Sequence, residues 1–165
     1  MWWALLACAD EDPVSLAPSA AALAAPEDWA PVADDPLPDA PPADRDCPAA
    51  TWGPEAGALE VQTGACAWFA AAQPAKVALH VGDTVEATVW HGDLDAAAPG
   101  EGHVALWVGD AVLWETWVPI PHDAAVYPVS VTVDRDWPAG TPVGVHLHNH
   151  GFNSWSVDAV WRVTQ

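Results

Sequence analysis

The chain has 165 residues, of which 52% are hydrophobic, enough for one domain with a real core and too few for two packed domains. Four Lys plus Arg against 23 Asp plus Glu give a formal charge of -19, and so acidic a surface repels phosphate backbones and excludes a nucleic-acid partner. No apolar run reaches the roughly 18 to 20 residues of a membrane-spanning helix, so we expect membrane contact only through a lipid anchor.

The start of the chain, Met1-Trp2-Trp3-Ala4-Leu5-Leu6-Ala7-Cys8, is apolar up to a cysteine. It resembles a bacterial lipobox, whose Cys becomes the acylated first residue of the mature protein. We therefore expect residues 1–8 to be a lipoprotein signal segment with lipidation at Cys8. The protein would then lie in the cell envelope, anchored to the outer membrane or exported to the cell surface. The charged n-region is missing and the apolar stretch is short, so a cytosolic start with an apolar patch is the alternative.

Cysteine arithmetic supports the lipoprotein interpretation. The chain has three Cys, and a lipidated Cys8 leaves the even pair Cys47 and Cys66. We predict a Cys47–Cys66 disulfide, which requires an oxidising compartment such as the one a lipoprotein occupies.

Residues 9–46 differ in composition from everything that follows, because Asp, Glu, Pro and Ala dominate them. Dense prolines prevent helix and ladder formation, and like charges extend the chain. We predict a disordered acidic Pro/Ala-rich linker over 9–46, with a short helix over Pro18–Ala25 as an alternative for that stretch. The folded domain is then 47–165.

From Cys47 onward, short runs of Val, Ala, Trp, Thr and Leu alternate with Gly, Pro, Asp and Asn, which indicates strands and turns. The spacing of about ten residues without an intervening helix predicts an all-β antiparallel β-sandwich or jelly roll. The expected strands are Ala58–Gln62, Ala65–Ala72, Lys76–His80, Thr84–His91, His103–Val108, Ala111–Pro119, Ala125–Val133, Pro142–Asn149 and Ser154–Val163.

Alternation along three of these strands assigns their faces. Val85, Ala87 and Val89 share the core face with His91, which leaves Glu86 and Trp90 on the other face. In the same way Val143, Val145 and Leu147, and likewise Val104, Leu106 and Val108, face the core. If the strands belong to one sheet, a single surface carries Glu86, Trp90, His103, Trp107, His146 and His148.

A series of short motifs follows from the second expected strand to the last. They are Trp68-Phe69, Gln73-Pro74, Val81-Gly82-Asp83-Thr84-Val85, Val89-Trp90-His91, Leu113-Trp114-Glu115, Trp137-Pro138-Ala139-Gly140-Thr141-Pro142 and Asn149-His150-Gly151-Phe152-Asn153-Ser154-Trp155-Ser156-Val157-Asp158-Ala159-Val160. Their order resembles the galactose-binding-like jelly rolls found among carbohydrate-binding modules, over residues 58–163. The resemblance implies two opposed sheets, a ligand on the concave face or at a rim, and in many members a structural calcium. Only Asp158 fits as a calcium ligand in the closing strand.

A pyranose ring stacks on an indole through its C–H face while neighbouring polar groups bind its hydroxyls. We therefore predict a non-catalytic, surface-anchored module that binds a glycan or cell-envelope polysaccharide. Its ligand-binding residues would be Glu86, Trp90, Trp107, His146 and His148. An enzyme is not expected, because no Ser lies in a Gly-x-Ser-x-Gly elbow and the paired acids fall in expected turns.

The alternative function uses His146, His148 and His150, which place imidazoles about 6.5 to 7 Å apart along one strand face. With a ligand from a neighbouring strand, such a group chelates zinc or copper. The protein would then be a metal-binding or purely structural surface lipoprotein.

Overall fold

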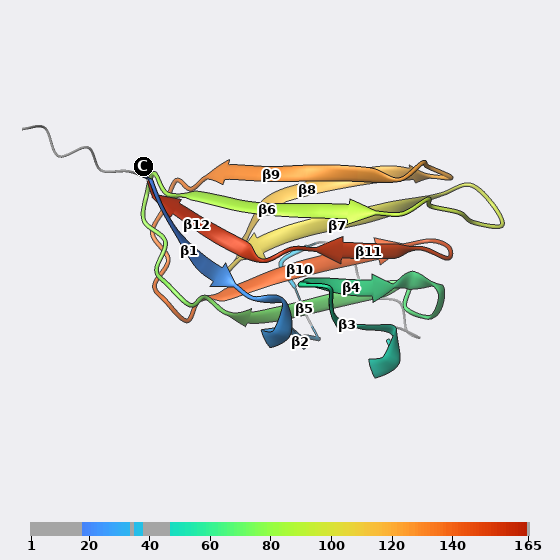
Figure 1. Ribbon diagram of the computed structural model, residues 1–165, viewed down its shortest axis with the longest axis horizontal. Coiled ribbons are helices and arrows are strands. Elements are labelled where there is room, and N and C mark those ends of the chain that lie inside the picture. The colour runs from blue at the N-terminus through green and yellow to red at the C-terminus, as the bar shows by residue number, and fades with distance from the viewer. Residues whose placement is uncertain (1–17, 34, 38–46, 165) are drawn as a thin grey trace, which may run out of the picture.

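The computed structural model describes residues 18–33, 35–37 and 47–164, and Figure 1 shows them as two layers of β-sheet. In chain order the strands are β1 (Ser19–Ala24), β2 (Ala30–Pro31), β3 (Trp52–Glu55), β4 (Ala58–Gln62), β5 (Trp68–Pro74), β6 (Thr84–His91), β7 (Gly100–Val108), β8 (Ala111–Ile120), β9 (Ala125–Thr132), β10 (Pro142–Asn149), β11 (Ser154–Val157) and β12 (Val160–Thr164). The 3-10 turns are η1 (Pro26–Asp28), η2 (Ala49–Thr51) and η3 (Thr63–Ala65). Within the described ranges, no helix has the length and apolar character needed to cross a membrane.

The two sheets differ in size. The front sheet has the order β1-β12-β6-β11-β4-β3, and β9 pairs with β6 along its whole length. The back sheet has the order β2-β5-β10-β7-β8. All pairings between the named strands are antiparallel. The predicted all-β antiparallel sandwich is therefore confirmed.

The core lies between the sheets and follows the predicted alternation. In β6 the predicted core residues Val85, Ala87 and Val89 are buried together with Thr84 and His91, while Glu86 is exposed. The apolar residues predicted for the core faces of β7 and β10 are buried as well. In β7 and β10 the residues between them are largely buried too, but the alternate apolar residues belong to the main core cluster while Ala105 and Trp107 belong to a separate one, so the face assignments are confirmed.

The described part of the predicted linker belongs to the sandwich, so the prediction of disorder is wrong there. β1 pairs with β12 at the edge of the front sheet, and β2 pairs with β5 at the edge of the back sheet. Leu23 and Ala24 are fully buried, and the buried Gln73 side chain bonds both the N–H and the C=O of Ala25. The free energy gained from these contacts offsets the conformational entropy that the segment loses on ordering, although its composition alone suggested disorder. The predicted lipobox with Cys8, and the linker residues 9–17, 34 and 38–46, lie outside the described residues.

The Cys47–Cys66 disulfide is confirmed. It ties the segment after the undescribed residues to the entry of β5. Two strand predictions need correction. Lys76–His80 is not a strand, because only Leu79 bridges to Trp137. The predicted strand Ser154–Val163 divides into β11 and β12, since the N–H of Asp158 bonds Thr88 O and its carboxylate caps Ala159 N.

Candidate functional site

The outer face of the back sheet carries a row of aromatic and imidazole side chains. On β10, His148 pairs with Trp68 of β5 on one side and with His103 of β7 on the other. His103 in turn pairs with Trp117 of β8. Directly opposed side chains in an antiparallel sheet lie close enough to contact one another, so four neighbouring strands contribute to one surface.

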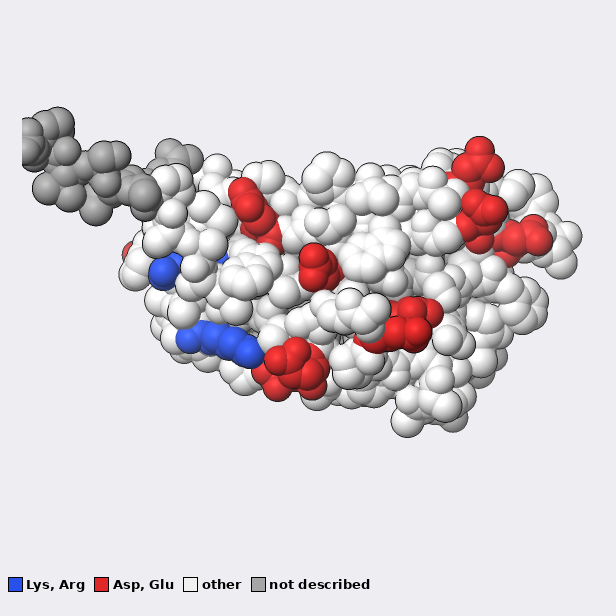
Figure 2. All heavy atoms as spheres, viewed as in Figure 1, with Lys and Arg blue, Asp and Glu red and all other residues white. Residues whose placement is uncertain are grey.

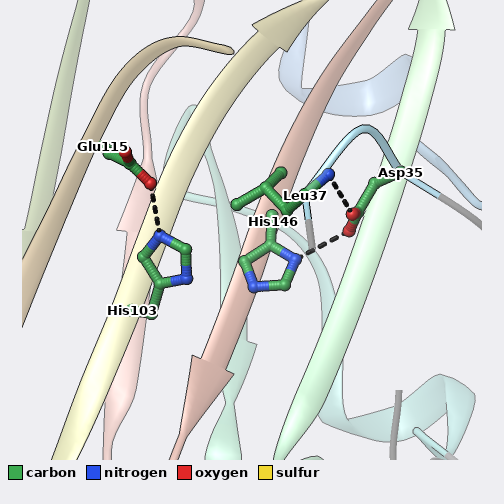
Figure 3. A network of polar contacts seen from close by, with 5 residues as sticks. All are labelled: Asp35, Leu37, His103, Glu115 and His146. Atoms are coloured by element: carbon green, nitrogen blue, oxygen red, sulfur yellow. Dashed lines mark hydrogen bonds and ion pairs between the residues drawn. The ribbon is translucent and has the colours of Figure 1, made fainter. Parts of the chain in front are cut away.

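Trp117 is the exposed member of this row, and His103 holds it in place. The two rings stack with centroids 3.8 Å apart and an interplanar angle of 6°. The His103 side chain is almost completely buried, and its Nε2–H donates to Glu115 Oε2 at 2.9 Å (Figure 3). Trp117 is 51% exposed. A stacked and bonded imidazole therefore presents half of an indole to solvent in a fixed orientation.

A second imidazole lies beside His103 and is fully covered. His146 Nδ1–H donates to Asp35 Oδ2 at 2.7 Å, and the two side chains are 0% and 2% exposed. In Figure 3 the two carboxylates, Asp35 and Glu115, approach the imidazoles from opposite sides. Asp35 also accepts the N–H of Leu37 at 3.0 Å. The pair therefore ties the N-terminal segment to the sheet.

We call residues 32, 33 and 35–37 the strap, because they cross the outer face of the back sheet. Val32 N–H donates to Ala70 O at 2.9 Å, and Leu37 packs with Ala105 and Trp107 in a small cluster of their own. Trp107 is only 4% exposed. The strap therefore covers one half of this face and leaves the half that contains Trp117 open.

The predicted common surface does not form as a unit. Glu86 and Trp90 lie on the outer face of β6 in the front sheet, whereas Trp107, His146 and His148 lie on the outer face of the back sheet. The assumption that β6, β7 and β10 belong to one sheet is wrong. Trp107 and His146 do point away from the core as predicted, but the strap buries them. Of the five residues, only His148 borders the open half of the back sheet.

The metal alternative is not assembled either. His148 and His150 have ring centroids 4.8 Å apart, while His146 is bonded to Asp35 and lies against His103. Within the described ranges, no three His, Cys, Asp or Glu side chains gather as ligands for zinc, copper or calcium.

A shallow groove lies beside Trp117, between β8, β10 and the loop that enters β7. Its volume is about 830 Å³, and its lining residues are Ala98, Pro99, Gly100, Glu101, Trp117, His148 and His150. His150 N–H donates to Glu101 O at 3.3 Å, and a Cβ at Gly100 would approach His150 Cβ to 3.0 Å. The groove therefore combines an aromatic plate with two imidazoles and a carboxylate.

Sequence reasoning missed Trp117 and Glu101 as site residues. Trp117 alternates with Val118 and Ile120 in β8, which places it off the core face. That signal was present in the sequence. The signal that singles it out, the stack on His103, depends on the register between β7 and β8.

A further imidazole, that of His91 at the end of β6, lies in the interior and does not line the groove. His91 Nδ1 bonds Gly92 O at 2.6 Å, and Nε2 lies 3.1 Å from the Tyr127 hydroxyl. Burial lowers the pKa of His91 below its usual value, and burial raises the pKa of Tyr127. Both groups therefore remain neutral in the fold near neutral pH.

Charge is distributed unevenly along the sandwich. The described basic side chains are Lys76, Arg135 and Arg162, and the Lys and Arg atoms visible in Figure 2 lie at the end of the molecule that carries the C-terminus in Figure 1. Asp and Glu side chains occupy the middle and the opposite end of that face (Figure 2). The loops near the groove contribute Asp93, Asp95 and Asp123, and the groove lining contains Glu101 but no Lys or Arg.

No protein-family model and no curated protein matches the sequence. Similar solved structures include adhesin domains and carbohydrate-binding modules. The K1 cleaved adhesin domain of Lys-gingipain from Porphyromonas gingivalis W83 matches with 14% identity and a TM-score of 0.46, over 90% of this chain and 99% of that chain. A CBM4 structure matches with 14% identity and a TM-score of 0.44, over 82% and 91%.

TmCBM61 in complex with β-1,4-galactotriose matches with 12% identity and a TM-score of 0.39, over 66% of this chain and 70% of that chain. At such identities and TM-scores the likenesses say nothing about what this chain binds. The ligand has to be inferred from the residues that line the groove of this chain.

Proposed function

We propose that the protein is a non-catalytic carbohydrate-binding module whose binding site is the groove at Trp117. The observation that carries the proposal is the half-exposed indole of Trp117, stacked on His103 at 3.8 Å. Exposed aromatic rings that a protein holds rigidly are suited to binding, because little conformational entropy is lost when the ligand docks. The C–H face of a pyranose is the complementary ligand surface.

Polar groups around the indole complete the site. His148 and His150 offer ring nitrogens, and Glu101 offers a carboxylate, all from the lining of the same groove. Sugar hydroxyls both donate and accept hydrogen bonds, so a mixture of imidazole and carboxylate groups satisfies them better than a purely apolar wall.

The test is a glycan array followed by titration calorimetry with the best polysaccharide. Trp117→Ala should lower the affinity about 30-fold or more, as truncation of a central aromatic contact typically does. The matched control is Trp161→Ala, since Trp161 is 41% exposed on the front sheet. Equal affinity of wild type and Trp117→Ala, or equal losses in both variants, would contradict the proposal.

The proposal also states that binding occurs without bond cleavage. Prolonged incubation with the bound polysaccharide should release no new reducing ends. Product formation that the Trp117→Ala variant lacks would make the groove an active site instead.

We further propose that a lipid on Cys8 anchors the domain in the cell envelope. Leu5-Leu6-Ala7-Cys8 supports this proposal, as does the Cys47–Cys66 bridge, which leaves Cys8 as the third cysteine. Intact mass of the natively expressed protein is the test, and a chain that retains Met1 without acyl groups would refute the anchor.

A further inference from the structure

Phe152 is the most exposed large apolar side chain in the described residues, at 76%. It lies in the turn between β10 and β11, and its ring covers the backbone at Gly64, where a Cβ would come within 2.5 Å of Phe152 Cδ1. The missing side chain at Gly64 leaves the space that the ring uses. Phe152 is therefore seated on a neighbouring loop while most of its surface faces solvent.

The turn that carries Phe152 is anchored from several sides. Phe152 N–H donates to Asp95 O at 3.1 Å, and Asp95 N–H donates to Asn153 Oδ1 at 2.6 Å. Thr63 contacts the same turn, because its N–H donates to Asn153 O at 2.8 Å and its hydroxyl donates to Gly151 O at 3.2 Å. So many bonds fix the turn that the exposed ring has a defined position.

The anchoring continues into the core. Asn149 Nδ2–H donates to Thr63 Oγ1 at 2.9 Å, and the buried Trp155 Nε1–H donates to Asn149 Oδ1 at 3.1 Å. An exposed Phe exposes apolar area to water, which costs free energy that a polar residue at the same position would avoid. A rigid turn that holds such a ring toward solvent is suited to binding, because little conformational entropy is lost when a ligand contacts the ring.

Phe152 adjoins the groove of the proposed site. His150 lines that groove, and two residues of chain span at most about 7 Å. Phe152 itself lines a second hollow of about 540 Å³, whose other walls are Thr51, Gln62, Gly64, Ala65, Asn153 and Ser154. The β10–β11 turn thus contributes to both, with His150 in the lining of the groove and Phe152 in the lining of the hollow.

The walls of this second hollow contain no ionisable side chain, only hydroxyl, amide and apolar groups. The groove contributes Glu101, and the adjacent loops contribute Asp93, Asp95 and Asp123, while the described Lys and Arg side chains belong to the opposite end of the sandwich. A chain of uronic acids would therefore meet like charge in the groove and at the adjacent loops and would gain no cationic partner in the hollow, whereas uncharged hexoses meet no such repulsion.

We infer that the ligand is an extended, uncharged polysaccharide chain that runs from Trp117 across the β10–β11 turn to a second aromatic contact on Phe152. The inference rests on the proposed carbohydrate-binding function and adds its chain-length dependence and its charge selectivity. Trp117 binds the first sugar residues, and Phe152 contacts a residue further along the same chain.

The experiment is a calorimetric titration of the full chain with neutral β-1,4-linked gluco-, manno- and galacto-oligosaccharides from disaccharide to hexasaccharide. In wild type the affinity should rise with length until the chain reaches Phe152. Phe152→Ala should leave the disaccharide affinity unchanged and lower the affinity for the longest oligosaccharides about three- to tenfold. Val81→Ala, which truncates another highly exposed apolar side chain away from the groove, is the matched control and should change neither value.

Charge selectivity is measured with β-1,4-linked gluco- or manno-oligosaccharides against glucuronate or mannuronate oligosaccharides of the same linkage and length, which differ in the C6 carboxylate. The uncharged chain should bind at least tenfold more tightly at low salt, with the difference shrinking as salt is added. Equal effects of Phe152→Ala at all lengths, no effect at any length, or a uronate chain binding as tightly as its uncharged counterpart would each overturn the inference while leaving the proposed function intact. Absence of glycan binding by wild type would instead refute the proposed function, and the inference with it.

Discussion

Removing the Asp35 carboxylate should release the strap from the back sheet. In the Asp35→Ala variant, His146 Nδ1 and the N–H of Leu37 both lose their Asp35 acceptor. His146 is fully buried and the Asp35 side chain is 2% exposed, so solvent does not compensate for either donor while the strap remains in place.

The expected loss follows from the burial of both donors. A buried hydrogen-bond donor left without its acceptor costs about 1–3 kcal/mol, and Asp35→Ala leaves two such donors, at His146 and at the Leu37 N–H. Because the strap can lift and let water reach both groups, we expect a total in the lower half of that range, about 3 kcal/mol. For a chain of this size that is a decrease in Tm of about 6–12 °C. Asp35→Asn keeps one oxygen acceptor and should lose less.

Thermal and urea unfolding measure this loss. Hydrogen exchange adds a local readout, since the Val32 and Leu37 amides should lose protection in Asp35→Ala. The matched control is Asp110→Ala, which removes an exposed carboxylate paired with Arg135 and should cost no more than about 1 kcal/mol. An Asp35→Ala variant as stable as Asp110→Ala, with unchanged protection at Val32 and Leu37, would refute the strap's docking.

Three further perturbations test other parts of the fold. Gly144→Ala should destabilise by about 1–3 kcal/mol in urea unfolding, because a Cβ there overlaps the Trp107 indole, whereas Gly92→Ala adds a Cβ in open space and should be near neutral. Burial lowers the pKa of His91 in the folded protein below its ordinary value of 6.5. Below pH 6.5 the unfolded chain therefore binds a proton at this residue more readily than the folded chain does, so the free energy of unfolding decreases as the pH falls, and above pH 6.5 this loss is absent. Tm measured against pH should therefore fall more steeply below pH 6.5 in wild type than in His91→Gln, and parallel curves would contradict this assignment. Reducing the Cys47–Cys66 bridge, which closes a loop with a sequence separation of 19, should lower stability by about 3 kcal/mol in the chain-entropy model, and a reduced protein with an unchanged urea midpoint would contradict it.

Local pattern was sufficient where one face of a strand is uniformly apolar. β4, β6 and β10 have the bounds that their runs predict, because Val and Leu at every second position leave only one face for the core. The same alternation correctly placed Trp107 and His146 off the core. The disulfide followed from cysteine arithmetic once Cys8 was set aside.

What the sequence did not reveal depends on contacts between distant segments. Asp35 and His146 are separated by 111 residues, and no local pattern in an acidic, Pro-rich segment indicates that one of its carboxylates meets a buried imidazole. Ser19–Ala24 is mostly Ala, so it lacks the β-branched alternation that marks a strand, and its pairing with β12 is decided by tertiary contacts. Sheet membership is equally non-local, which is why Trp90 and Trp107 were assigned to one surface although they lie on opposite outer faces.

The most direct test of carbohydrate binding at Trp117 is a titration of the protein, labelled with ¹⁵N at its Trp indoles, with the oligosaccharide that the array selects. The Trp117 Nε1–H resonance should shift and saturate with the ligand, while the resonances of Trp90 and Trp161 on the front sheet and of strap-covered Trp107 stay in place. A shift at Trp90 or Trp161 with Trp117 unchanged would contradict the groove as the binding site.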